Sequence, residues 1–397
     1  MDVDGLKARA CAAIDEQAGA LVALSLRIHD HPELAFQETQ AAAWLAEYLR
    51  GRRFDVTAGI GGLPTAFRAV AGAGSPAVAI LAEYDALPGI GHGCGHNIIA
   101  TAAAGAGAGV RAVIDELGGS VQVIGTPAEE VYAGKAIMIA AGAFDGLDAA
   151  IMTHPGTRDT VIAKALACAE LKVEYHGREA HAAAQPERGI NALEAMIIAY
   201  NAINSLRQHI RRTARVHGVI TDGGEAPNIV PGHSAASFLV RAEDDAYLEE
   251  LKRRVADCFE AGARATGARL ELTWNAHRYS AMNTNSVIGR AHRKNLAALG
   301  REVPEVETAR PMGSTDMGNV SKVVPAIHPS IAIAPGDVNS HSPEFAEYAA
   351  SDAGHRAVID GAKALAMTAI DILADADLRK AMRAEFERAG EQPAALE

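Results

Sequence analysis

Short apolar runs of strand length alternate with longer helical runs through the first half of the chain. Residues 77–82 and 121–125 are strand-like, and a helix is expected over residues 98–117 between them. A further helix near residues 134–142 leads to a strand expected at residues 149–152. Because strands and helices alternate, this part of the chain predicts a doubly wound α/β domain.

The residues before this alternation predict two amphipathic helices and two strands. One helix is expected over residues 4–28, with the helix breaker Pro32 soon after it, and a second over residues 39–51. Residues 54–57 and 65–70 have the composition of β-strands.

The pattern changes near Ala167. The expected order from there is strand, helix, strand, strand, helix, strand, which is the split β-α-β-β-α-β motif of ferredoxin-like domains. These elements are expected at residues 169–175, 190–211, 216–220, 234–242, 245–265 and 269–275. A small second domain is therefore predicted in the middle of the chain.

The α/β character returns after this small domain. A helix is expected near residues 287–299, a strand at residues 331–334, and a long C-terminal helix from Asp352. The two flanking parts must share one sheet, so the α/β domain is predicted to be discontinuous. The predicted bounds are 1–166 and 280–397 for the α/β domain and 167–279 for the inserted domain.

Composition and charge narrow the partners and the location of the protein. The chain has 397 residues and a formal net charge of −12, which argues against a nucleic-acid partner or an anionic membrane. Its four cysteines lack CxxC spacing, and its first residues are acidic where a signal peptide needs bases, so we expect a cytoplasmic location. The longest uncharged run, residues 98–110, is shorter than the ~18 residues that a membrane span needs.

Side chains of metal-binding type follow the expected strands. The carboxyl ends of parallel strands meet at one edge of an open sheet, and ligands bind there. Cys94 and His96 lie in the loop that opens the helix expected from residue 98. The other candidates each follow a strand: Asp85, Glu129, Glu130, His154 and His341.

These side chains together indicate a two-metal hydrolytic site. Imidazole, thiolate and carboxylate ligands suit zinc, with manganese, cobalt and nickel as alternatives. Glu129 and Glu130 cannot both face one ion from a regular strand, because successive side chains diverge. One glutamate is therefore expected to bind metal while the other reaches a water molecule.

The motifs in this order resemble those of one enzyme family across nearly the whole chain. They are E-Y-D-A-L-P, G-H-G-C-G-H-N, P-A-E-E, T-H-P, G-R-E-A-H-A-A-A, P-N-I-V-P, G-S-T-D-M-G-N-V-S and a late N-S-H. The chain resembles the co-catalytic two-metal amidohydrolase and metallopeptidase family, which includes aminoacylase, glutamate carboxypeptidase and the auxin-amino-acid conjugate hydrolases. The resemblance implies that the α/β domain is catalytic and that the inserted domain is a lid or dimerisation domain.

The resemblance also implies a role for each metal-site residue. Cys94 would bridge two divalent ions, where other branches use an aspartate. Glu130 and His341 would bind one ion, and His96 and His154 the other. Glu129 would be the general base acting on a metal-bridged hydroxide or water, and Asp85 would orient a ligand.

Further residues are implied to bind substrate, each with a plainer alternative. His181 would stabilise the oxyanion, often across a dimer interface, or else be a surface histidine. Asn228 and Arg241 would hold the substrate carbonyl and carboxylate, or Arg241 would be a structural arginine of a strand. Ser314 and Thr315, with Asp316, would line the pocket or cap a helix.

The predicted function is metal-dependent hydrolysis of an amide bond in an N-acyl amino acid or small dipeptide with a free carboxylate. Asn97, and the direct run from D-A-L-P into G-I-G-H, resemble the branch of aminobenzoyl-glutamate hydrolase and β-alanyl-lysine dipeptidase. The alternatives are a deacylase of aromatic or auxin-like conjugates, a thiol enzyme using Cys94, and a catalytically silent metal-binding or scaffold protein. The expected partners are a small-molecule amide and, through the inserted domain, a second copy of the chain.

Overall fold

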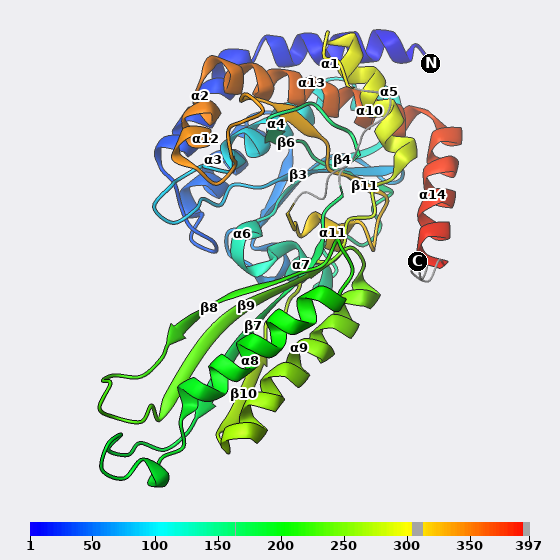
Figure 1. Cartoon of the computed structure of the whole chain (residues 1–397). Coiled ribbons are helices and arrows are strands. Elements are labelled where there is room, and N and C mark those ends of the chain that lie inside the picture. The colour runs from blue at the N-terminus through cyan, green and yellow to red at the C-terminus, as the bar shows by residue number, and fades with distance from the viewer. Residues whose placement is uncertain (163, 304–312, 392–397) are drawn as a thin grey trace. The chain divides into compact units, whose positions relative to one another are not determined.

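The computed structural model describes residues 1–162, 164–303 and 313–391, and these form two compact units (Figure 1). The large unit contains Met1–Lys164 and Met282–Pro393, and the inserted unit contains Ala165–Ala281. Residues 392–397, at the end of the predicted α/β domain, lie outside the described residues.

A six-stranded mixed sheet forms the centre of the large unit, in the order β1-β2-β4-β3-β5-β11. Strand β3 lies between β4 and β5 and is parallel to both. Strands β2 and β1 extend the sheet antiparallel beyond β4. The bounds are β1 Asp55–Ala58, β2 Phe67–Ala73, β3 Ala77–Ala82, β4 Gly119–Gly125, β5 Ala149–Ile151 and β11 Ala326–Ile327.

Both faces of this sheet are covered, which explains why all six residues of β3 are buried. Val78 and Ile80 belong to one hydrophobic core, and Ala79 and Leu81 to a second core on the opposite face. A continuous apolar strand is typical of a parallel sheet buried on both sides. The predicted doubly wound α/β fold is confirmed for this unit.

Helix α4 (His96–Arg111) is enclosed on all sides. It packs against β3 and β4 on one side and against α1, α2 and α13 on the other. Every residue from His96 to Val110 is buried. A Cβ atom on Gly107 would lie 2.3 Å from Val123 Cγ2, and one on Gly105 2.8 Å from Leu21 Cδ1. The glycines of this helix therefore allow its backbone to approach its neighbours closely.

The single helix predicted over residues 4–28 is wrong, because the chain forms α1 (Val3–Asp15) and α2 (Ala18–Asp30) instead. Gln17 lies at the break, where its side-chain amide donates to the Ala13 carbonyl at 2.9 Å. The Tyr48 hydroxyl donates to Gln17 Oε1 at 2.8 Å. One local and one long-range contact thus hold the Gln17 side chain at the break, and the periodicity of the sequence did not reveal the break.

The other helices and strands of the large unit surround the sheet or extend from it. Strands β6 and β12 form a separate parallel pair. Among the described residues, no helix combines the length and apolar character that a bilayer-spanning segment needs. The remaining bounds are α3 Thr39–Arg50, α5 Ile114–Leu117, α6 Glu129–Tyr132, α7 Gly134–Ala140, β6 His154–Gly156, α10 Ser286–Ala298, α11 Met317–Val320, β12 Ser330–Ala332, α12 Pro343–Ala349, α13 Asp352–Ala374 and α14 Ala376–Glu391.

The inserted unit has the predicted β-α-β-β-α-β order, so the predicted fold class is confirmed here too. Its antiparallel sheet has the strand order β10-β7-β9-β8, with α8 and α9 along one face (Figure 1). Leu171, Val173 and Tyr175 of β7 enter the core, whereas the residues between them are on the other face. The bounds are β7 Ala167–His176, α8 Ala192–Leu206, β8 Arg215–Asp222, β9 His233–Ala242, α9 Asp245–Thr266 and β10 Arg269–Trp274.

The close packing of α4 predicts that Gly107→Ala destabilises the protein. The new methyl group would overlap Val123, and overpacking of this kind costs about 1–3 kcal/mol, more than the better helix propensity of alanine returns. Gly19→Ala in α2 is the matched control, because a Cβ atom added there would have no atom within 4 Å, and it should stabilise by up to about 1 kcal/mol. Urea unfolding measures the change in unfolding free energy of both variants. Equal changes in Gly107→Ala and Gly19→Ala would contradict the packing argument.

Candidate metal centre

The Asp85 carboxylate joins three segments at the carboxyl edge of the large sheet. One oxygen lies 3.1 Å from His96 Nδ1, at the start of α4, and the other accepts the Glu130 backbone N–H at 2.9 Å. Burial works to raise the pKa of Asp85, but His96, the Glu130 N–H and Lys135 together outweigh it, so the net shift of the pKa is downward. Asp85 thus orients His96 and positions the segment after β4.

Six potential metal-donor side chains gather beside Asp85. Cys94 Sγ lies 3.4 Å from His154 Nε2, and Glu130 Oε1 lies 3.7 Å from His96 Nε2 and 3.5 Å from His341 Nε2. Two groups each bring three donor atoms within 4.8 Å of one another, and they share Cys94. The first contains Cys94, His96 and His154, and the second contains Cys94, Glu130 and His341; Glu129 joins His96 and Glu130 in a third group.

The donor atoms fit divalent ions rather than a network of hydrogen bonds. His96 Nε2 and Glu130 Oε1 are buried and have no hydrogen-bond partner within the described part of the chain. A buried polar atom without a partner is costly, and bound metal would satisfy both. The mixture of nitrogen, sulfur and carboxylate donors suits zinc and its borderline neighbours.

Unusual backbone conformations hold the two adjacent glutamates in place. Glu129 and Glu130 begin the one-turn helix α6, and not a strand as the divergence argument assumed. Ala128 and Ala133 on either side have positive φ angles of 61° and 50°. The Ala128 N–H donates to the buried Glu38 carboxylate at 2.9 Å. Such strain is characteristic of functional sites, where the surroundings stabilise it.

Gly95 is required between the two donors that flank it. Its φ angle is +75°, which side chains other than glycine rarely adopt. A Cβ atom there would lie 2.4 Å from Pro155 Cγ, next to His154. The Pro155 ring packs directly on the Gly95 backbone, and this close packing accompanies the contact of Cys94 with His154.

A buried cation and two more carboxylates lie next to these donors, and sequence reasoning did not identify Lys135 or Glu83. Lys135 Nζ lies 2.6 Å from Glu83 Oε1 and 2.6 Å from Asp316 Oδ1. Glu83 and Asp316 form a further acidic group with Glu129. Side chains two residues apart in an extended segment point to the same side, so Glu83 could have been predicted to lie on the same side as Asp85.

The acidic surroundings act strongly on Glu129. Burial, followed by the charges of Glu83 and Asp316, raises the pKa of Glu129 well above its usual range. Burial also raises the pKa of Asp316 to about 6, against the lowering effect of Lys135. The site therefore favours a proton on Glu129 when no positive ion offsets the carboxylates.

The environment of Cys94 argues against a thiol nucleophile. Burial, and then the Glu130 carboxylate, raises the pKa of the Cys94 thiol far above its usual range. Burial lowers the pKa of His154 to about 3, with the neighbouring His328 contributing in the same direction. Cys94 and His154 thus lie close without the charges of a thiolate-imidazolium pair, and a metal ion is the natural source of a thiolate here.

Comparisons with known proteins identify the family. Residues 167–266 match the model of the peptidase dimerisation domain of the M20 family. A mouse Xaa-Arg dipeptidase is 40% identical over 97% of this chain and 93% of its own length. The chain belongs to the M20 peptidase family. The predicted two-metal hydrolase branch is therefore confirmed, and the protein is an enzyme that hydrolyses amide bonds.

Other M20 relatives agree with this assignment. One of the p-aminobenzoyl-glutamate hydrolase subunits of Escherichia coli K12 is 36% identical and aligns over 63% of this chain and 56% of its own length. A Bacillus subtilis structure described as a dinuclear metal binding peptidase has a TM-score of 0.71 at 20% identity, over 90% of this chain and 99% of that one. At that identity, the structural likeness shows the fold alone.

His328 is a buried neighbour of the M20 donor set that the sequence left unassigned. Its ring centroid lies 5.2 Å from that of His154. Neither ring nitrogen has a hydrogen-bond partner within the described residues. His92, two residues before Cys94, instead lies 3.1 Å through Nε2 from the Ile28 carbonyl, which agrees with a structural role in the loop.

The structure brings two of the three substrate-binding candidates of the inserted unit together. His181 and Asn228 lie in adjoining segments, where the Ala182 N–H donates to the Asn228 carbonyl at 3.0 Å. Arg241 lies at the other end of β9. The strand from His233 to Arg241 spans roughly 26 Å at ~3.3 Å per residue. Asn228 and Arg241 of the same chain are therefore far apart.

Thr315 has a local hydrogen bond that agrees with the helix-cap alternative. Its hydroxyl accepts the Met317 N–H at 3.2 Å, at the start of α11. Ser314 precedes it and is half-buried. The neighbouring Asp316 carboxylate contacts Lys135 rather than capping the helix.

The buried charge network predicts that Lys135→Met destabilises the protein strongly. Removing the cation leaves two buried carboxylates unpaired, which costs about 3–5 kcal/mol. Their pKa values in the folded state would rise above the unfolded values, so protonation would stabilise the variant at low pH and its deficit would grow as pH rises.

Urea unfolding of the metal-free protein at pH 5 and pH 8 measures this deficit. Lys380→Met, at an exposed position in α14, is the matched control and should change stability by less than about 0.5 kcal/mol. A Lys135→Met variant as stable as this control at both pH values would contradict the assigned charge network.

Proposed function

We propose that this M20 enzyme hydrolyses the amide bond of a small dipeptide or N-acyl amino acid with a free carboxylate, using two divalent ions. One observation carries the proposal: two triads of donor atoms share Cys94 and lie beside Glu129. We assign Cys94 as the bridging ligand, Glu130 and His341 to one ion, and His96 and His154 to the other. This assignment follows the two triads directly.

Each nearby residue then has a chemical task. When bound, two such ions lower the pKa of a shared water and polarise the substrate carbonyl. Glu129 accepts a proton from the attacking water and returns it to the leaving nitrogen, so that the amine departs neutral. Asp85 holds the His96 ring through Nδ1 and leaves Nε2 to face metal.

We propose zinc as the native metal, with manganese as the main alternative. A thiolate and three imidazoles are softer donors than the all-oxygen sets that manganese and magnesium prefer. The proposed cytoplasmic location fits this thiol, since all four cysteines are free.

The preferred substrate is proposed to be a dipeptide. The mouse relative named Xaa-Arg dipeptidase aligns over nearly the whole chain, whereas the p-aminobenzoyl-glutamate hydrolase relative aligns over 63% of it. A panel of dipeptides ending in arginine or lysine, N-acetyl amino acids, p-aminobenzoyl-glutamate and indole-acetyl conjugates tests this. Faster turnover of the indole-acetyl conjugates would favour the alternative deacylase.

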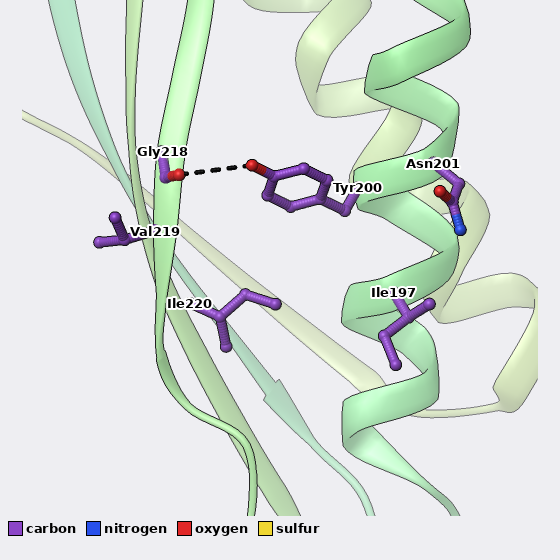
Figure 2. Close-up of a pocket in the computed structure, with 6 residues that line it drawn as sticks. All are labelled: Ile197, Tyr200, Asn201, Gly218, Val219 and Ile220. Atoms are coloured by element: carbon purple, nitrogen blue, oxygen red, sulfur yellow. Dashed lines mark hydrogen bonds between the residues drawn. The ribbon is translucent and has the colours of Figure 1, made fainter.

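We further propose that the inserted unit forms a homodimer through β8 and α8. β8 is an edge strand, and it lines an apolar groove together with α8. Figure 2 shows Tyr200 of α8 directed at Gly218 and Ile220 of β8 directed toward α8, whereas Val219 is on the other side of the strand. Val219 is 62% exposed, which is unusual for a large apolar side chain. A second copy with the same edge and groove would cover this surface.

The separation of Asn228 and Arg241 supports a dimer that shares substrate-binding residues. An extended dipeptide spans only about 7 Å, far less than the roughly 26 Å of strand that separates them within one copy. If both residues hold one substrate, they come from two copies. We propose that His181, adjacent to Asn228, stabilises the oxyanion from the same copy as Asn228.

The proposed general base gives a sharp test. Glu129→Gln should keep both ions, because its neighbours supply the ligands, and lose ~10²–10⁴-fold in turnover. Glu130→Gln is the contrasting variant and should lose metal as well as activity. Metal content by atomic emission and turnover on the preferred substrate are measured together. Full turnover in Glu129→Gln with intact metal content would rule out the assignment.

The proposed dimer predicts that Val219→Asp produces a monomer. A charge on each of two paired edge strands would be buried and would oppose its copy. Sedimentation velocity measures the mass. Val323→Asp, at a 46% exposed position of the large unit, is the matched control and should leave the dimer intact. Retention of the dimer in Val219→Asp would place the interface elsewhere.

A further inference from the structure

A second group of histidine and carboxylate side chains lies in the inserted unit, apart from the family motifs. It contains Glu174 and His176 of β7 and His233 of β9. The strand register pairs His176 with His233, and Glu174 is two residues away on the same face of the sheet. This face is opposite the one that packs on α8 and α9, so the group is accessible to solvent.

The donor atoms of this group have the spacing of ligands around one small ion. His233 Nε2 lies 3.1 Å and His176 Nε2 3.8 Å from Glu174 Oε2. One donor atom from each residue lies within 4.8 Å of the other two. Ligands around a tetrahedral zinc ion, with bonds of about 2.0–2.1 Å, are roughly 3.3 Å apart. Small side-chain adjustments would therefore suffice to bind an ion.

Asp222 orients His233 as a metal ligand requires. Its Oδ2 atom lies 2.6 Å from His233 Nδ1, which turns Nε2 toward Glu174 Oε2 at 3.1 Å, where a bound ion would replace the Nε2 proton. A carboxylate behind a histidine is the usual support of a metal-binding imidazole. The geometry on β9 thus resembles a ligand with its supporting residue already in place.

A protonated His233 bridging the two carboxylates is the competing explanation. Hydrogen bonding to Asp222, and then to Glu174, raises the pKa of His233, which agrees with such a bridge. It does not explain His176, whose Nε2 atom is shielded from solvent and has no hydrogen-bond partner in the described part of the chain. Glu271 Oε2, 3.7 Å from this nitrogen, is instead paired with Arg269 at 3.2 Å.

We propose that Glu174, His176 and His233 bind one divalent transition-metal ion, for which zinc is the best fit. Two imidazoles and one carboxylate are a typical zinc donor set, and water would take the fourth position. The negative charges of Glu174 and Asp222 attract a cation. This ion would be additional to the two of the proposed catalytic centre, and the inference does not depend on the enzyme's substrate.

The position of the site indicates a structural role. The Gly177 N–H donates to the Gly232 carbonyl at 2.7 Å, directly beside the two histidines. The segments that carry His181 and Asn228 start at this point. An ion joining β7 to β9 here would fasten the base of both segments.

The test is the zinc content of the full-length protein at equilibrium with buffered zinc. The double variant His176→Ala/His233→Ala should bind one equivalent less than the wild type and keep the ions of the catalytic centre. His217→Ala, an exposed histidine of β8, is the matched control and should lose none. Equal zinc content in the double variant and the wild type would overturn the proposal.

A second variant tests the orientation of His233. Asp222→Asn keeps all three ligands but weakens the support of the imidazole, so the zinc dissociation constant of this site should rise about 10–100-fold. Competition with a chromogenic chelator measures this dissociation constant. Subtracting the zinc binding of the double variant from that of the protein with both histidines isolates the contribution of this site. An unchanged dissociation constant would overturn the assignment of His233 Nε2 as a donor.

Discussion

The contact of one carboxylate with two segments holds the proposed metal centre together. Asp85 accepts the Glu130 N–H and contacts His96 Nδ1, so the end of β3, the start of α4 and the turn after β4 are joined at one point. His96 and Glu130 are 11 and 45 residues from Asp85 in the sequence, and the fold brings all three together. Any displacement of Asp85 would separate His96 from Glu130, and with them the two triads that share Cys94.

This arrangement concentrates negative charge in a buried place, and the fold offsets it in two ways. Lys135 pairs with Glu83 and Asp316, which removes part of the repulsion without occupying the donors. Two of the donor atoms, His96 Nε2 and Glu130 Oε1, are buried and have no hydrogen-bond partner among the described residues. Divalent ions would supply both the missing charge and the missing contacts. Without bound ions this arrangement of buried carboxylates and unpaired donors lowers the stability of the fold, and such clusters are typical of functional sites.

The inserted unit has a different physical organisation. Only one face of its sheet is covered by helices, so the other face can carry polar groups such as Glu174, His176 and His233. Its edge strand β8 exposes apolar side chains beside α8. A one-sided sheet of this kind leaves surfaces available for assembly and for binding, which agrees with the peptidase dimerisation domain that it matches.

The sequence by itself indicated the fold class, the family and the order of the elements in the inserted unit. Strand β3 was predicted with its observed bounds, because a short apolar run with turn residues before it has few other interpretations. The β-α-β-β-α-β order of the inserted unit was also readable, since its elements alternate clearly between periods of two and 3.6. The motifs predicted the donor set through their resemblance to the family, and the structure brings these side chains close together.

Only the tertiary structure decided features that depend on contacts between distant segments. The chain breaks between α1 and α2 at Gln17, whose side chain contacts Tyr48, thirty-one residues away, and the local periodicity did not indicate this. Lys135 looks like an ordinary helix lysine until the fold encloses it between Glu83 and Asp316. The pairing of His176 with His233 likewise requires the register of β7 and β9. Local patterns report the periodicity of a segment, whereas burial and charge depend on which segments meet.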